Sequence, residues 1–254
     1  MCLNNDKLNP SIFEKFKGLI WKIKINNKTG LMAIESRNLE LKQVYFTVLD
    51  IHNGKINFKE KSYEEVWNLS LAHIGKENLL ITGFEHSGSL ESKGILSVNL
   101  KDGSLIWQKF NMRLNQVNES ELQVYDPRIY PRKYSWIDHL TAENLNHPIQ
   151  NTPESNSIIL PEIENPFKLP EFIKHQKIRS EFLTLIYKDI YFVSFHEQIA
   201  DFIQQRLIVY QGTNILLDDI LISGIQKLQP EAFFIQHDQL FYIRNKQEII
   251  SYLV

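Results

Sequence analysis

Residues 125–138 contain the densest group of side chains that could contact a ligand. Aromatic rings alternate there with arginines and carboxylates: Tyr125, Asp126, Arg128, Tyr130, Arg132, Tyr134, Trp136 and Asp138. A guanidinium group binds carboxylate or phosphate through paired hydrogen bonds, and an aromatic ring offers a flat face to a sugar. The segment therefore indicates contact of Arg128 or Arg132 with an anionic or sugar-like ligand. In the alternative reading, Tyr134 and Trp136 alternate along one strand and face a core.

Three hairpins of the same layout would form the scaffold around these side chains. Each has a strand, a tight turn and a second strand, at residues 44–58 around Asn53-Gly54, 95–107 around Asp102-Gly103, and 207–217 around Gln211-Gly212. Asparagine and glycine are favoured in two-residue hairpin turns because they tolerate positive φ angles. Further strand-like runs precede each hairpin, so the repeating unit is predicted to be a four-stranded sheet.

Two less regular copies extend the repeat. One, without a turn glycine, covers residues 121–147 with its turn near residues 141–144, and the last copy covers residues 232–254. The last copy has three strands and would need residues 19–25 as its fourth. We therefore predict an all-β fold, a β-propeller of five blades whose ring is closed by pairing of an N-terminal strand with the C-terminal blade.

The prolines set the expected boundaries within one domain of residues 1–254. Residues 1–17 are predicted to be an N-terminal tail. Residues 146–180 are predicted to be a connection, because their five prolines lack the N–H group that a central strand needs. If residues 157–160 and 172–178 form strands instead, the propeller has six blades.

The hairpins resemble the repeats of quinoprotein-type propellers (PQQ-type repeats), in which D-x-x-t-G is followed by k-x-l-W. Residues 102–107 (DGSLIW) and 50–56 (DIHNGKI) carry the match, which covers the repeat hairpins. The whole chain, with its residues 130–138 (YPRKYSWID), also resembles an uncharacterised family of Bacteroidetes proteins with no assigned function. These resemblances imply a fold and leave the activity open. Quinone-dependent dehydrogenases are larger and exported, and their cofactor-binding residues have no counterpart that we can place here, so no cofactor is expected.

In a propeller, the loops between the second and third strands of each blade surround one mouth of the channel, where they can build a site on a rigid scaffold. This assignment predicts a ligand-binding rim. Its candidate residues are Arg37, Glu85, His86, Asp126, Arg128, Tyr130, Arg132 and His196, with Glu40, Glu91 and Glu197 beside them. The alternative is a solvated rim crossed by surface salt bridges.

Composition excludes several classes of partner. The net charge of −2 offers no broad positive surface for nucleic acid or for an anionic membrane. No apolar run reaches the ~18 residues of a membrane-spanning helix. The single cysteine and the absence of an N-terminal secretory signal lead us to expect a cytoplasmic location. The histidines lack metal-ligand spacing such as H-E-x-x-H, so no metal is expected and they are read as surface or turn residues.

The expected function is that of a monomeric propeller scaffold that binds a protein or a small polar ligand on its loop face. The alternative is a glycosidase-like hydrolase with carboxylates of different blades as general acid and base, for which Glu85, Asp126 and Asp138 are the candidates. The chain contains no G-x-S-x-G, P-loop or G-x-G-x-x-G motif. Facing carboxylates in a deep pocket would favour the hydrolase, and a shallow rim of arginine and tyrosine would favour binding.

Overall fold

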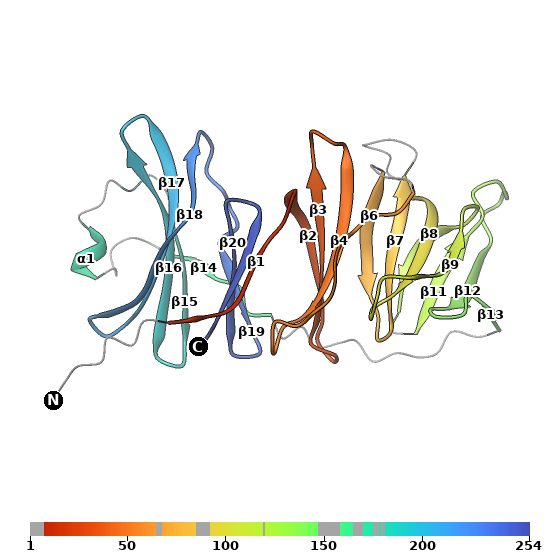
Figure 1. Ribbon diagram of the computed structural model, residues 1–254, viewed down its shortest axis with the longest axis horizontal. Helices are drawn as coiled ribbons and strands as arrows, with labels where there is room; N and C mark the ends of the chain where they lie inside the picture. The colour runs from red at the N-terminus through yellow and green to blue at the C-terminus, as the bar shows by residue number, and fades with distance from the viewer. Residues whose placement is uncertain are drawn as a thin grey trace. The chain divides into compact units, whose positions relative to one another are not determined.

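The computed structural model is built from antiparallel sheets (Figure 1). It describes residues 8–64, 68–84, 92–118, 120–146, 158–164, 170–174, 178 and 181–254. The chain divides into two compact units, one formed by Met1–Lys15 with Ser157–Val254 and the other by Phe16–Asn156. The predicted all-β class is confirmed.

The unit formed by Phe16–Asn156 contains, in its described residues, three sheets whose four strands follow chain order. The first sheet comprises β2 (Leu19–Asn26), β3 (Leu31–Asn38), β4 (Gln43–Asp50) and β5 (Ile56–Lys61). The second comprises β6 (Leu69–Ile74), β7 (Asn78–Phe84), β8 (Ser92–Asn99) and β9 (Leu105–Lys109). The third comprises β10 (Arg113–Val117), β11 (Glu121–Tyr125), β12 (Tyr134–Asp138) and β13 (Asn144–Leu145). Four antiparallel strands in this order have the topology of a propeller blade.

The other unit contains two sheets in its described residues. The five-stranded sheet comprises β14 (Glu162–Glu164), β15 (Phe182–Tyr187), β16 (Ile190–Ile199), β17 (Phe202–Gln211) and β18 (Asn214–Ile225). The four-stranded sheet has the order β1-β21-β20-β19 and comprises β1 (Pro10–Lys15), β19 (Phe233–Gln236), β20 (Gln239–Arg244) and β21 (Glu248–Leu253). A short helix, α1 (Glu171–Lys174), lies between β14 and β15 in the chain.

The two ends of the chain share a sheet, as predicted, but through a different strand. β1, red in Figure 1, pairs antiparallel with the C-terminal strand β21, with Phe13 opposite Ile250. Residues 19–25, which we expected in this place, belong to β2 of another sheet. Residues 10–15 of the predicted tail take the place instead. Their pattern PSIFEK has only two large apolar side chains, of which Ile12 is buried, so periodicity gave little sign of a strand.

The three predicted hairpins are β4–β5, β8–β9 and β17–β18. In the first two, the connection is longer than the predicted two residues. The amide of Gly54 donates to the carbonyl oxygen of Asp50 (2.9 Å) and that of Gly103 to Asn99 (2.8 Å), so the glycine closes a five-residue turn. The φ angles of Gly54 and Gly103 are +69° and +67°, in the region that glycine adopts without strain. The glycines were therefore correctly identified as structural.

The weaker copy makes the same turn without glycine. The amide of Ala142 donates to the carbonyl oxygen of Asp138 (3.0 Å), and Ala142 has a φ of +58°. The turn spans residues 138–142, slightly before the predicted residues 141–144. An alanine in this conformation costs free energy relative to glycine. Because the turn has no glycine, this copy was harder to recognise in the sequence.

Few of the described residues in the proline-rich segment 146–180 form strands. In its described residues, Ile159 forms an isolated bridge with Ile235, and residues 162–164 form β14 at the edge of the five-stranded sheet. Phe172 lies in α1, and Ile178 makes a single bridge with Glu197. The strand expected at residues 172–178 for a sixth blade is therefore not present in the part of this segment that is described.

Candidate functional site

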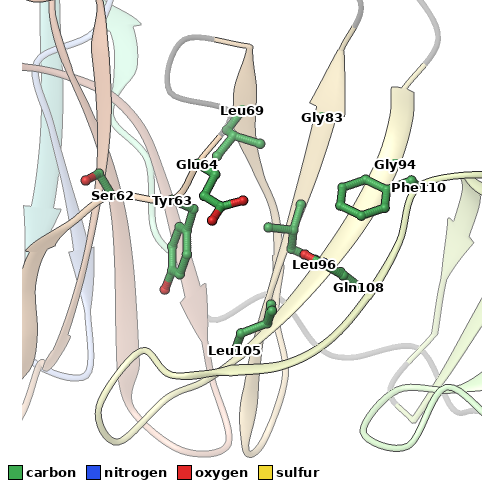
Figure 2. A pocket seen from close by; sticks show the side chains of 10 residues that line it. All are labelled: Ser62, Tyr63, Glu64, Leu69, Gly83, Gly94, Leu96, Leu105, Gln108 and Phe110. Carbon is green, nitrogen blue, oxygen red and sulfur yellow. The ribbon is translucent and has the colours of Figure 1, made fainter.

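A hollow of about 450 Å³ lies over the β6–β9 sheet (Figure 2). This volume is within the range of small-molecule sites in proteins. The residues that line it are Ser62, Tyr63, Glu64, Leu69, Gly83, Gly94, Leu96, Leu105, Gln108 and Phe110. None of them was among the predicted site residues.

Two facing glycines, Gly83 and Gly94, line this hollow. Gly83 of β7 pairs with Gly94 of β8 on one side and with Leu69 of β6 on the other. Two residues further along the same strands, Leu71 pairs with Ile81, and both are fully buried in the core between this sheet and the β2–β5 sheet. Residues two apart on a strand face the same side. The hollow therefore lies on the face of the sheet that carries the core residues Leu71 and Ile81, next to the two positions that have no side chain, Gly83 and Gly94.

Leucines and aromatic rings form most of the wall. Leu105 and Phe110 are 48% and 57% exposed, so their apolar surface is open to a ligand. The Tyr63 hydroxyl donates to the carbonyl oxygen of Gly103 (2.8 Å), which holds the ring in place. Burial, with the nearby Asp102 carboxylate, raises the pKa of Tyr63, so its hydroxyl stays protonated. The Tyr63 side chain thus offers a ligand its ring.

Glu64 brings a charge to this apolar wall. Among the described residues that line the hollow, Glu64 is the only acidic one, and none is a lysine or an arginine. Figure 2 shows its carboxylate directed between Tyr63 and Leu96, into the space that the other side chains surround. The arrangement combines a large apolar surface with one acidic group, which suits a ligand that is mainly apolar and carries a positive or hydrogen-bond-donating group.

The predicted residues of the β11–β12 connection lie together on an exposed loop. The Arg128 guanidinium donates to both carboxylate oxygens of Asp126, at 2.6 and 3.0 Å. Arg132 lies over the ring of Tyr125, with its Cζ atom 4.9 Å from the ring centroid, and Tyr130 is 96% exposed. Both arginines therefore contact residues of their own hairpin. The carboxylate of Asp126 already pairs with the Arg128 guanidinium, so Arg128 has a counterion without an external anion.

Two other candidates lie inside strands, contrary to the prediction that they belong to loops. Arg37 is in β3, and its guanidinium pairs with the buried carboxylate of Glu35 at 2.6 Å. His196 is in β16, is buried, and accepts a hydrogen bond from the amide of Gln229 at 3.0 Å. Burial lowers the pKa of His196. Both strands run further than the sequence pattern indicated. Glu85, His86 and Glu91 lie outside the described residues.

The carboxylates named for the hydrolase alternative are poorly placed for acid–base chemistry. The hydrogen bond from Arg128 lowers the pKa of Asp126 to about 2, so this group is ionised and is no proton donor at neutral pH. Asp138 accepts from the amides of Leu140 and Thr141 and caps a turn. Asp138 pairs with Glu121, five positions from Asp126, so roughly 17 Å of strand separates the two acids at ~3.3 Å per residue. Paired glycosidase carboxylates lie only ~5 to 9 Å apart.

Two histidines that we read as surface or turn residues form a cluster in the interior. His139 is 5% exposed, and its Nδ1 lies 3.0 Å from the Oδ1 atom of Asn78. The carbonyl oxygen of His139 accepts from Asn78 Nδ2 (2.7 Å) and from Trp107 Nε1 (3.2 Å). The His73 and His139 rings meet edge to face at 5.4 Å between centroids. Burial lowers the pKa of each to about 4, with Lys24 contributing at His73 and His73 at His139.

The buried histidine pair predicts acid sensitivity. An unfolded histidine titrates near 6.5, whereas His73 and His139 stay neutral in the fold down to about pH 4. Between these values the unfolded chain binds more protons, so the free energy of unfolding should fall as the pH decreases, by about 3 kcal/mol for one histidine. Urea unfolding at pH 7.0 and 4.5 measures this loss. Between pH 7.0 and 4.5, the free energy of unfolding should decrease less in His73→Gln than in the wild type. In the control His52→Gln, which changes an exposed histidine, it should decrease as much as in the wild type. Equal decreases in all three proteins would contradict the prediction.

The described part of the chain holds neither a cluster of metal ligands nor a membrane-spanning helix. No three side chains of His, Cys, Asp or Glu gather closely enough there to hold a metal ion. No helix there has the length and apolar character needed to cross a membrane.

The sequence of residues 25–107 matches the family model for a "Domain of unknown function (DUF4905)". The match covers less than half of the chain and includes the lining residues of the hollow from Ser62 to Leu105. A search of curated proteins finds no match.

Several solved structures are similar to the chain at low identity. BamB from Moraxella catarrhalis is 8% identical, over 93% of this chain and 85% of that one, with a TM-score of 0.35. The β-propeller domain of the Trilobed protease from Pyrococcus furiosus, described with an open velcro topology, is 12% identical over 89% and 64%, with a TM-score of 0.35. The Cps50 (Swd1) β-propeller domain from Myceliophteria thermophila is 8% identical over 97% and 99%, with a TM-score of 0.36.

Proposed function

We propose that this protein is a binding protein of the β-propeller type and that its ligand occupies the hollow over the β6–β9 sheet. The observation that carries the proposal is the space of about 450 Å³ lined by Gly83, at the point where the row of buried core residues in β7 would otherwise continue. The apolar walls supply the binding surface. The proposal keeps the binding function expected from the sequence and moves the site away from the loop arginines.

We also propose that the five sheets are propeller blades, with the first and last strands sharing one blade. The up-and-down order of the four-stranded sheets supports this architecture. Pairing of β1 with β21 is the kind of contact by which a propeller joins its two ends.

The hydrolase is the less favoured function. Asp126 is held by Arg128, and Asp138 lies at the other end of its hairpin. Within the described lining of the hollow, Glu64 is a single carboxylate without a second acid to share the roles of general acid and base. The geometry therefore supports binding over glycoside cleavage.

A side chain placed on the floor of the hollow tests the proposal. Gly83 has no positive φ, so Gly83→Val is compatible with its strand and would place two methyl groups in the space. We expect wild-type protein to bind 1-hexanol, observed by saturation-transfer NMR, and Gly83→Val to bind it at least about tenfold more weakly, the loss expected when some 50 Å² of apolar contact is blocked.

Thr82→Val is the matched control. Thr82 is the neighbouring residue on the opposite face of β7, and valine has nearly the same shape as threonine. This variant should bind 1-hexanol as the wild type does. Absence of binding by the wild type, or equal binding by Gly83→Val with its fold intact by circular dichroism, would refute the proposed site.

A further inference from the structure

We infer that the ligand of the hollow carries an alkylammonium group, bound by the Glu64 carboxylate with its carbon chain against the leucine wall. This inference rests on the proposed function and deepens it. Glu64 supplies a negative charge directed into the space, and Leu69, Leu96 and Leu105 supply the apolar surface. Among the described lining residues no lysine or arginine opposes this charge.

The rings beside the carboxylate favour a cation over a neutral donor. Phe110 is 57% exposed at the hollow, and the hydroxyl of Tyr63 is already bonded to Gly103. The electron-rich face of an aromatic ring attracts an ammonium group within about 6 Å of its centroid. The Glu64 carboxylate and the aromatic rings that line the hollow would therefore both attract an ammonium group, whereas a carboxylate ligand would meet repulsion from Glu64.

The class of ligand follows from what each part of the wall can recognise. An ammonium group pairs with the Glu64 carboxylate. Each methylene group of the chain that is buried against the leucines contributes about 0.8 kcal/mol of favourable binding free energy. A free alkylamine and a lysine side chain of a peptide share this chemistry. We therefore expect selection by charge at the head and by apolar length along the chain.

Three probes with the same six-carbon chain test the head group: 1-hexylammonium, 1-hexanol and hexanoate. Isothermal titration or ligand-detected NMR should give an affinity of wild-type protein for hexylammonium roughly tenfold above that for hexanol, from an exposed ion pair and a cation–π contact. Hexanoate should bind more weakly than hexanol. Added salt should weaken hexylammonium binding and leave hexanol binding unchanged.

Variants assign the selectivity to named groups. Glu64→Gln should remove the ion-pair part, leaving the affinity for hexylammonium about twofold to fivefold above that for hexanol, and should leave the affinity for hexanol itself unchanged. Phe110→Leu keeps an apolar side chain and should lose only the cation–π part, about twofold to fivefold for hexylammonium. Glu77→Gln, which removes an exposed carboxylate from the β6–β7 connection of the same sheet, is the control and should behave as the wild type.

The source of the ammonium group is resolved by a further probe, N-acetyl-lysine-methylamide. Binding of this compound at least as tight as that of 1-butylammonium, and lost in Glu64→Gln, assigns the ammonium to a lysine side chain, and weaker binding assigns it to a free amine. Equal affinities for all three six-carbon probes, still lost in Gly83→Val, would overturn the inference and leave the proposed binding site standing. If no probe binds to the wild type, the proposed function itself fails.

Discussion

Replacing Glu35 with glutamine is expected to lower the free energy of unfolding by about 3 to 5 kcal/mol, the usual effect of breaking a buried ion pair. Glu35 is fully buried, and its Oε1 accepts from the Arg37 guanidinium at 2.6 and 2.7 Å. Its Oε2 accepts from the amide of Leu71 at 2.7 Å and from the hydroxyl of Ser70 at 3.1 Å. The carboxylate thereby joins β3 of one sheet to β6 of the next.

A glutamine cannot replace these contacts although it has the same shape. Its amide has one accepting oxygen and one donating NH₂ group, so the NH₂ group would face either Arg37 or the amide of Leu71, and both are donors. An NH₂ group at the Oε1 position loses both contacts from Arg37, and one at the Oε2 position loses at least the bond from the Leu71 amide. In either orientation the Arg37 charge loses its counterion in a mostly buried place.

Urea unfolding monitored by far-ultraviolet circular dichroism, which reports on the strands of both units, measures the effect. Asp218→Asn serves as the control, because Asp218 also pairs with an arginine through two hydrogen bonds of 2.6 Å, to Arg206, but at an exposed position. We expect less than about 1 kcal/mol from this control. A loss below about 1 kcal/mol for Glu35→Gln would show that the Glu35 network adds nothing beyond a surface pair.

Removing residues 1–15 is the second change with a large expected effect. β21 would lose one of its two hydrogen-bonded neighbour strands, β1, and the buried side chain of Ile12 would leave the core. Loss of a buried isoleucine alone costs about 2 to 5 kcal/mol. The contacts of Ser11 with Ser251 and of Lys15 with Glu248 would be lost too. We expect the free energy of unfolding of this unit to fall by at least about 3 kcal/mol.

Hydrogen exchange locates this effect on the sheet. Amides of residues 248–253 should exchange much faster in the truncated protein, because the new edge strand opens to solvent. Removal of residues 1–7 leaves β1 intact and should change neither stability nor exchange in β21. A synthetic peptide of residues 8–17 should restore protection when added in excess. Unchanged exchange in β21 after removal of residues 1–15 would refute pairing of the chain ends.

The hairpins were predictable because their signals are local. Gly54 and Gly103 occupy turn positions with positive φ, and strand-like runs rich in apolar residues flank each turn. β1 was missed for the opposite reason. Its partner strand lies about 240 residues away in sequence, as the Ser11–Ser251 contact shows, and its own six residues carry too weak a pattern to be recognised alone.

The predicted site residues show where the assignment of loops from the sequence fails. Arg37 and His196 were expected on an exposed rim because they were assigned to loops between the second and third strands of their blades. Arg37 instead pairs with Glu35, and His196 lies buried in β16. The exposure of a residue depends on the sheet that packs against it. Residues adjacent in the sequence do not reveal which sheet that is.

The repeated strand–turn–strand pattern, with glycines at the turns, was enough to predict an all-β chain of repeated antiparallel sheets. Such patterns act through backbone preferences of a few adjacent residues, so they survive in any context. The strand that completes the C-terminal sheet and the hollow at Gly83 and Gly94 were decided only by tertiary structure. Strand register brings these two glycines opposite each other, and packing brings Glu64 and Phe110 beside them, from positions 46 residues apart in the sequence. Register and packing are long-range properties, because their free energy depends on pairs of residues that meet only when the chain folds.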